Sequence, residues 1–224
     1  MTNKVVLLIH LLATLIMPIA VLLLSSCSTK RVELPDYEGV DIREIISDRS
    51  SIESIEATFS VEFEKNDSTM TGDAALELTD EILDLRIYSM GFLVAEITES
   101  DGIVKCNPPV SKTRSAILVN GLRSGFFWWQ IKDYELEEQN GTYQLRNSQQ
   151  KILIDKKTML PTYQAIELDN GRELRIFYDN PVNSGGFWHA SKMRIEMSKY
   201  VVRLDIKSLS FLPRPDQGQQ QQHL

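Results

Sequence analysis

Apolar and polar residues alternate along most of the chain, which is the pattern of β-strands with one face on a core and the other in water. From Ile55 to Glu64 the alternation is unbroken, and Met193, Ile195 and Met197 repeat it near the carboxyl end. Short turn signals such as Asn140-Gly141 separate these segments. The pattern predicts about eleven strands, joined in chain order as antiparallel meanders.

Two segments have helical spacing instead. Asp41 is a plausible N-cap for a short amphipathic helix in which Ile42, Ile46 and Arg49 are spaced by three or four residues. Leu118, Leu122 and Phe126 predict a second helix from Lys112 to about Trp129. We therefore expect a mostly β fold with two helices: a curved antiparallel sheet that forms an unclosed half β-barrel, with the helices covering its mouth.

The amino end predicts an exported, lipid-anchored protein. A nearly unbroken apolar run from Val5 to Leu24 ends in Leu24-Ser25-Ser26-Cys27, which resembles the lipobox of bacterial lipoproteins. That resemblance implies cleavage after residue 26, covalent diacylglycerol and N-acyl lipid on Cys27, and no other cofactor or metal. An uncleaved signal anchor is the alternative, because about 20 apolar residues can span a bilayer. Ser28, in place of an aspartate, favours the outer membrane, facing the periplasm.

These signals divide the chain into four parts. A signal peptide covers 1–26 and a lipidated tether 27–39; the domain covers 40–212, and a polar, glutamine-rich tail, expected to be disordered, covers 213–224. The mature chain of 224 − 26 = 198 residues suits one domain.

Charge and cysteine content limit the possible partners. With 24 basic and 31 acidic residues, the chain offers no basic field for nucleic acid. If Cys27 carries the anchor, Cys106 has no intramolecular partner in an oxidising compartment, which leaves a buried bystander thiol or an intermolecular disulfide.

Little in the domain predicts an enzyme. Of three histidines, His10 lies in the leader and His223 in the tail, so His189 beside Trp188 is the remaining candidate, and its expected role is structural. The sequence has no metal-binding His-x-x-x-His or Cys-x-x-Cys, no G-x-S-x-G and no phosphate-binding glycine loop.

The order of elements resembles the superfamily of the periplasmic lipoprotein carrier LolA and the outer-membrane lipoprotein receptor LolB. The resemblance rests on the lipobox, the tether and helix, the strand Leu85-Arg86-Ile87 with its following loop, and the internal helix between two meanders. Residues 155–161, Asp-Lys-Lys-Thr-Met-Leu-Pro, are similar to a strand–turn–strand step of this superfamily. The receptor has a protruding loop with an exposed leucine after its Leu-Arg-Leu strand; here that place holds Met90-Gly91-Phe92-Leu93, which is similar in apolarity but differs in motif.

Two candidate sites follow. An acyl-chain cavity is expected to be lined by apolar residues of the inward sheet face and the aromatic cluster: Phe59, Leu83, Leu85, Ile87, Trp128, Trp129 and Met193. For the aromatic residues 126–129, core filling is the favoured role, and an exposed contact surface is a further alternative to the cavity wall. An exposed apolar loop is expected at Met90, Phe92 and Leu93, with ordinary burial as its alternative.

The leading hypothesis is therefore a non-enzymatic, lipid-anchored protein that binds acyl chains of lipoproteins or lipids in an apolar cavity, as a lipoprotein receptor would. Its partners would be the membrane, through the anchor, and lipoproteins. The alternative is a structural or assembly lipoprotein with a filled core and no ligand that docks onto an envelope complex. The alternation alone does not separate the two, because inward residues of a filled and a hollow barrel are alike.

Overall fold

A computed structural model describes residues 34–37, 39–66, 68–168 and 171–213, and residues from Leu34 onward form one compact unit. The expected leader, Cys27 and the tail from residue 214 lie outside the described residues. The elements, in chain order, are α2 (Ile42–Arg49), β1 (Ile52–Lys65), β2 (Ser68–Thr79), β3 (Ile82–Ser89), β4 (Phe92–Ser100), β5 (Ile103–Asn107), α3 (Lys112–Phe126), the 3₁₀ turn η1 (Trp128–Gln130), β6 (Glu135–Gln139), β7 (Thr142–Arg146), β8 (Gln150–Asp155), β9 (Leu160–Glu167), β10 (Glu173–Ser184), β11 (Phe187–Met197) and β12 (Tyr200–Pro213).

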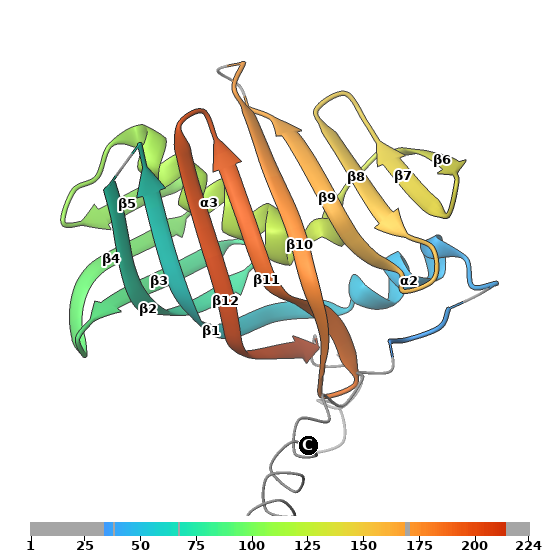
Figure 1. Cartoon of the computed structure of the whole chain (residues 1–224), viewed down its shortest axis with the longest axis horizontal. Helices are drawn as coiled ribbons and strands as arrows, with labels where there is room; N and C mark the ends of the chain where they lie inside the picture. The colour runs from blue at the N-terminus through green and yellow to red at the C-terminus, as the bar shows by residue number, and fades with distance from the viewer. Residues whose placement is uncertain (1–33, 38, 67, 169–170, 214–224) are drawn as a thin grey trace, which may run out of the picture. The chain divides into compact units, whose positions relative to one another are not determined.

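The described strands form one 12-stranded antiparallel sheet in the order β5-β4-β3-β2-β1-β12-β11-β10-β9-β8-β7-β6. Two meanders, β1 to β5 and β6 to β12, are joined in the middle by the β1–β12 pair, so that β5 and β6 are the two edges (Figure 1). The sheet curves and does not close, which confirms the predicted open half-barrel; the strand number is twelve, where about eleven were predicted.

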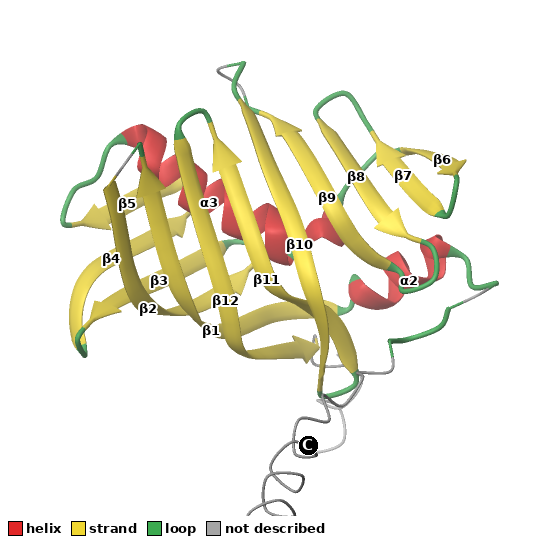
Figure 2. Ribbon diagram, viewed as in Figure 1, coloured by secondary structure: helices red, strands yellow, loops and turns green. Residues whose placement is uncertain are grey.

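This topology determines where α3 lies. Because α3 connects β5 to β6, the chain must cross from one sheet edge to the other, and it does so over the inward face, against β10, β11 and β12 (Figure 2). The helix begins at the N-cap Ser111, whose side chain accepts a hydrogen bond from Arg114 N. Its buried residues include Ile117, Leu118 and Leu122.

The inward sheet face and the helices share one hydrophobic core. The alternation predicted for β1 is confirmed, because Ile55, Ala57, Phe59 and Val61 are all buried. The short helix α2 also begins as predicted, with the Asp41 side chain accepting from Arg43 N.

Two predicted boundaries are wrong. The second helix ends at Phe126, and η1 follows, because one straight helix cannot bury four consecutive aromatic side chains, all of which are buried here. In the sequence, Asp179-Asn180-Pro181 predicts a turn and Gly185-Gly186 a longer loop. In the structure β10 stays paired with β11 through Asp179 and Pro181, and Gly185-Gly186 forms the two-residue turn of one long hairpin. Pro181 is tolerated in β10 because the pairing with β9 ends at Phe177, and the positive φ of 54° at Asn180 makes room for an irregularity in the strand.

Candidate functional site

The residues predicted to line an acyl cavity come together in the core. Phe59, Leu83, Leu85, Trp128, Trp129 and Met193 are buried in one cluster, and Ile87 is half-buried against it. The ring centres of Phe59 and Phe126 are 6.4 Å apart, and this contact joins β1 to the end of α3. The sheet and the aromatic residues after α3 therefore contribute to the same interior.

The interior is filled by α3 rather than left open. A Cβ atom added at Gly121 would lie 2.8 Å from Ile195 Cγ2, so the helix backbone packs directly on β11. The partly open pocket beside the helix has a volume of about 30 Å³, enough for roughly one or two water molecules. In this conformation that pocket has no room for an acyl chain.

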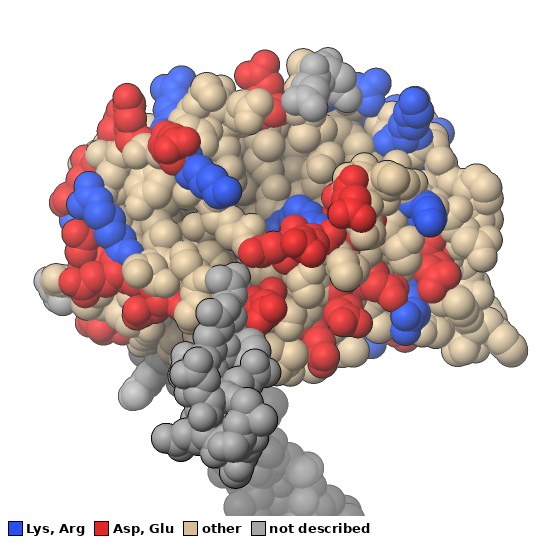
Figure 3. All heavy atoms as spheres, turned by 180° about the vertical axis from the view of Figure 1, so that it is seen from behind, with Lys and Arg blue, Asp and Glu red and all other residues tan. Residues whose placement is uncertain are grey.

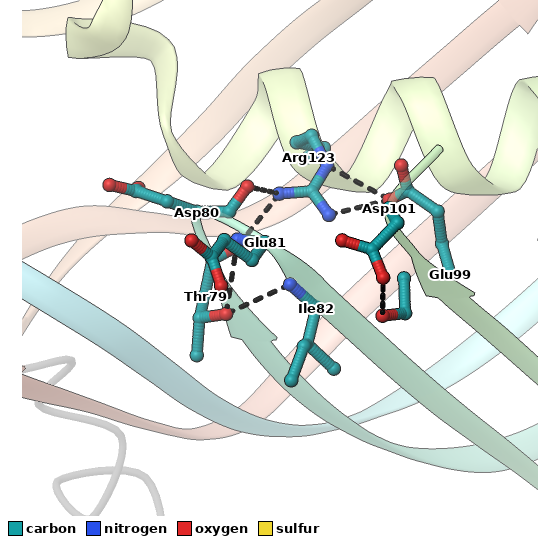
Figure 4. Close-up of polar contacts among 8 residues, drawn as sticks. Thr79, Asp80, Glu81, Ile82, Glu99, Asp101 and Arg123 are labelled. Atoms are coloured by element: carbon teal, nitrogen blue, oxygen red, sulfur yellow. Dashed lines mark hydrogen bonds and ion pairs between the residues drawn. The ribbon is translucent and has the colours of Figure 1, made fainter. Parts of the chain in front are cut away.

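One arginine fixes α3 to the first meander. Arg123 Nη1 donates to the carbonyls of Thr79, at 2.7 Å, and Asp80, at 2.9 Å, while Nε and Nη2 donate to Glu99 Oε2 at 3.1 and 2.5 Å (Figure 4). We call this group the Arg123 clamp. It satisfies a carboxylate and two carbonyls with one guanidinium, so it holds the helix over the β2–β3 turn and β4.

The small interior space also lies at the C-terminal end of α3, and only some of the expected cavity residues reach it. Its lining joins α2, the end of α3, η1 and β9 to β12: Arg49, Gly125, Phe126, Trp128, Trp129, Leu160, Pro161, Tyr178, His189, Ala190, Met193, Ile206, Leu209 and Phe211. Phe59, Leu83, Leu85 and Ile87 do not line it. We call this space the Arg49 pocket.

Arg49 is the one strongly basic group of this pocket, and only 7% of its surface is exposed. Its Nη2 donates to the carbonyl of Trp188 at 3.0 Å, and its Cζ lies 5.5 Å from the ring centre of Trp128 and 5.4 Å from that of Trp129. Within the described part of the chain no carboxylate pairs with it. Burial lowers its pKa from 12.5 to about 10, so it remains a cation at neutral pH.

Two other buried donors at or near the pocket, Trp129 Nε1 and Gln164 Nε2, have no hydrogen-bond partner among the described residues. Tyr178 OH donates to Gln164 Oε1 at 2.5 Å, and burial raises the pKa of Tyr178 well above 10. Trp129 Nε1 is buried and has no acceptor among the described residues. The Trp129 indole N–H, which has no described acceptor, therefore lies next to the Arg49 guanidinium, which has no described carboxylate partner.

His189 is oriented by the backbone. Its Nδ1 lies 2.9 Å from the Ala190 carbonyl, which can only accept, so Nδ1 carries the proton and Nε2, 2.9 Å from Ser184 Oγ, accepts from that hydroxyl. Burial, and to a lesser extent Arg49, lower its pKa below 6.5. The group that orients this histidine is a carbonyl rather than a carboxylate, which differs from a hydrolytic triad.

The predicted apolar loop lies at the β3–β4 turn. Met90 is 95% exposed, Phe92 75% and Leu93 53%. This turn projects from one end of the sheet in Figure 1, and the corresponding corner of the molecule carries no charged side chain in Figure 3. Next to it, β5 pairs with β4 only from Glu96 to Ser100, so the outer edge of Phe92–Ala95 has no neighbouring strand among the described residues.

The remaining candidate chemistry is limited. In the residues that the structure describes, no group of three or more His, Cys, Asp or Glu side chains could hold a metal ion. No helix of the described residues is long and apolar enough to cross a bilayer. Cys106 is half-buried in the edge strand β5, and desolvation raises the pKa of its thiol.

Comparison with known proteins identifies the fold. The chain is similar to a LolA superfamily protein from Nitrosomonas europaea, with a TM-score of 0.53 and 14% identity over 80% of this chain and 96% of that one. It has the LolA-like fold. A DUF1329 family protein from Desulfovibrio piger matches with a TM-score of 0.50 and 14% identity over 82% of this chain and 94% of that one. No protein-family model and no curated protein matches the sequence.

Two arginines of this site were not predicted as functional residues. Arg49 carried a signal, because it lies in helical phase with Ile42 and Ile46, where an apolar residue is expected. Arg123 carried none, since its acceptors are two backbone carbonyls and a glutamate 24 residues away.

Proposed function

We propose that this chain is a non-enzymatic, lipid-anchored envelope protein that takes acyl chains of lipoproteins or lipids into the apolar interior beneath α3. The observation that carries the proposal is an inward sheet face, mainly apolar, that one helix covers in a LolA-like fold. The lipobox at Cys27 supports attachment to the outer membrane, facing the periplasm.

Because the interior is filled, uptake requires α3 to move away from β11. Its displacement would expose the apolar residues that it now covers, and each Å² of apolar surface then covered by an acyl chain would contribute about 25 cal/mol. The exposed Met90 and Phe92 would provide a first apolar contact for the incoming chain.

A disulfide between α3 and β11 tests this proposal. A Cβ atom at position 121 would lie 3.7 Å from Ile195 Cβ, which suits a disulfide, where this distance averages about 3.8 Å. The variant combines Gly121→Cys and Ile195→Cys with Cys106→Ser, in a soluble form that begins at Ser28. Reduced protein should bind a fluorescent fatty acid saturably, and oxidised protein should not.

The matched control is the Cys106→Ser protein, which should bind equally under both conditions. Equal uptake by the oxidised and reduced disulfide variant would contradict entry beneath α3. An absence of saturable uptake by the control would contradict acyl binding altogether.

The alternative function, an assembly lipoprotein with a solid core, is favoured by one specific observation. The unpaired edge of Phe92–Ala95, with its exposed side chains, can accept an additional strand from a partner protein. Phe92→Asp and Leu93→Asp should then abolish crosslinking to an envelope partner while the acyl-binding measurement is unchanged.

A further inference from the structure

The Arg49 pocket combines features that a purely structural arginine does not need. A buried cation is costly unless a carboxylate or several hydrogen-bond acceptors compensate it. Among the described residues, one carbonyl, the faces of two indole rings and the nearby Tyr37 do so, and a single hydrogen bond from the guanidinium, to Trp188, uses one of its five N–H donors.

A second donor adds to this imbalance independently. Trp129 is 3% exposed, its Nε1 has no acceptor within the described residues, and Arg49 stacks on its ring. Both side chains line the same pocket. The rest of that lining is mainly apolar, with Phe126, Met193 and Leu209 among its residues. A group that satisfied these donors would therefore be an acceptor attached to an apolar body.

We propose that the Arg49 pocket binds the carboxylate of a long-chain fatty acid, with Arg49 and Trp129 Nε1 donating to its oxygens. The inference rests on the proposed acyl-binding function and deepens it, because it assigns the head end of the chain to one place. The acyl tail would extend from the pocket past Phe126 and Met193 into the space that α3 vacates.

The donors of the pocket favour a carboxylate over a phosphate. Arg49 and Trp129 Nε1 are the two donor groups, and a planar carboxylate presents two oxygens where a tetrahedral phosphate presents more. The negative charge of a carboxylate also matches a cation with no acidic partner among the described residues, whereas the hydroxyl of an alcohol is neutral. Head-group selectivity is thus the property to measure.

Isothermal titration calorimetry at pH 8 tests the assignment with three ligands that share one tail: dodecanoate, dodecanol and dodecyl phosphate. The soluble form from Ser28 should bind dodecanoate roughly tenfold more tightly than dodecanol. Dodecyl phosphate should bind more weakly than dodecanoate, and equal or tighter binding would overturn the preference for a carboxylate.

Variants locate the effect. Arg49→Met should lower the affinity for dodecanoate to that for dodecanol, and Arg49→Lys should retain part of the difference. Trp129→Phe keeps an aromatic ring and removes the donor, so it should lower dodecanoate affinity a few-fold even if Arg49→Met does not fold. The matched control is Arg43→Met on the same helix, whose side chain is 62% exposed and does not line the pocket.

The outcomes separate this inference from the proposed function. Equal binding of dodecanoate and dodecanol by the unaltered protein, or an unchanged ratio in both Arg49→Met and Trp129→Phe, overturns the head-group site and leaves acyl binding in place. Failure of all three ligands to bind overturns both.

Discussion

Arg123 on α3 and Arg49 on α2 differ in how many hydrogen-bond acceptors surround their guanidinium groups. Arg123 reaches a carboxylate and two carbonyls, and 22% of its side chain is exposed. Arg49 is more deeply buried and has one carbonyl and two ring faces. A guanidinium with a full set of acceptors stabilises a fold, whereas one with few acceptors raises the free energy of its site until a ligand provides them.

The two arginines also have different neighbours around the C-terminal end of α3. Arg123 lies in the last turn of the helix and reaches the β2–β3 turn and β4, and half a turn earlier Gly121 packs directly on β11. The Arg49 pocket is lined by Gly125 and Phe126 of the same end and by the η1 residues that follow. The clamp and the donors that lack a described acceptor therefore lie at the same end of α3, against different parts of the sheet.

The largest expected effect is the difference in stability between the two variants that each lack one guanidinium. Arg123→Met leaves Glu99, whose side chain is only 16% exposed, and two carbonyls without a donor, so we expect the free energy of unfolding to fall by about 2–3 kcal/mol. Arg49→Met replaces an undercompensated buried cation by an apolar chain of similar length, and we expect a change within about 1 kcal/mol. Urea unfolding of the soluble form measures both.

A double variant is the control for this contrast. Adding Glu99→Leu to Arg123→Met removes the unpaired carboxylate, so part of the lost stability should return. If Arg49→Met destabilises the protein as much as Arg123→Met, Arg49 has a structural role equal to that of the clamp, and the contrast between the two arginines does not hold.

Alanine substitution of the two glycines of α3 should change the stability of the protein by a smaller amount. Alanine at position 121 would force its Cβ to 2.8 Å from Ile195 Cγ2, while at position 125 the nearest atom, Met193 Sδ, is 3.4 Å away. Alanine in a helix gains about 1 kcal/mol over glycine, and overpacking costs about 1–3 kcal/mol. Gly121→Ala should therefore lower the melting temperature, and Gly125→Ala should leave it unchanged or raise it. The reverse order would show that the tighter contact lies at Gly125, which lines the Arg49 pocket.

Much of this fold could be predicted because alternation is a local signal. From Ile55 to Val61 the buried residues of β1 occupy every second position, and the cap at Asp41 needs only its own neighbours. The long β10–β11 hairpin could not be predicted. Asn180-Pro181 is a local turn signal, but in the structure this segment is paired with residues 190–192 and stays in the strand. Within each meander the neighbouring strands follow the chain order, as predicted, but the central β1–β12 pair could not be predicted, since it joins the two ends of the domain.

The candidate site was predictable only in part, for a related reason. The apolar identity of Phe59, Leu85 and Met193 follows from their period, and so does their burial. Whether their interior is empty depends on how closely α3 approaches, which is determined by Gly121 opposite Ile195, a contact across 74 residues. Arg49 illustrates the converse: a charged residue in an apolar phase is itself a visible signal of a site.

The smallest effect is electrostatic and falls on His189, which lines the Arg49 pocket. Its pKa is lowered by burial first and by the positive charge of Arg49 second, while its hydrogen bond to Ala190 opposes both. A folded-state pKa below 6.5 means that the unfolded chain binds the proton more tightly, so His189 leaves stability unaffected above pH 6.5 and lowers it as the pH falls toward the folded-state pKa. Arg49→Met removes a nearby cation, so it should raise the His189 pKa toward 6.5 and reduce the acid sensitivity, whereas Arg123→Met should not change that pKa. NMR titration of the imidazole resonances measures the shift, and an unaltered His189 pKa in Arg49→Met would show that no charge at Arg49 is felt in the pocket.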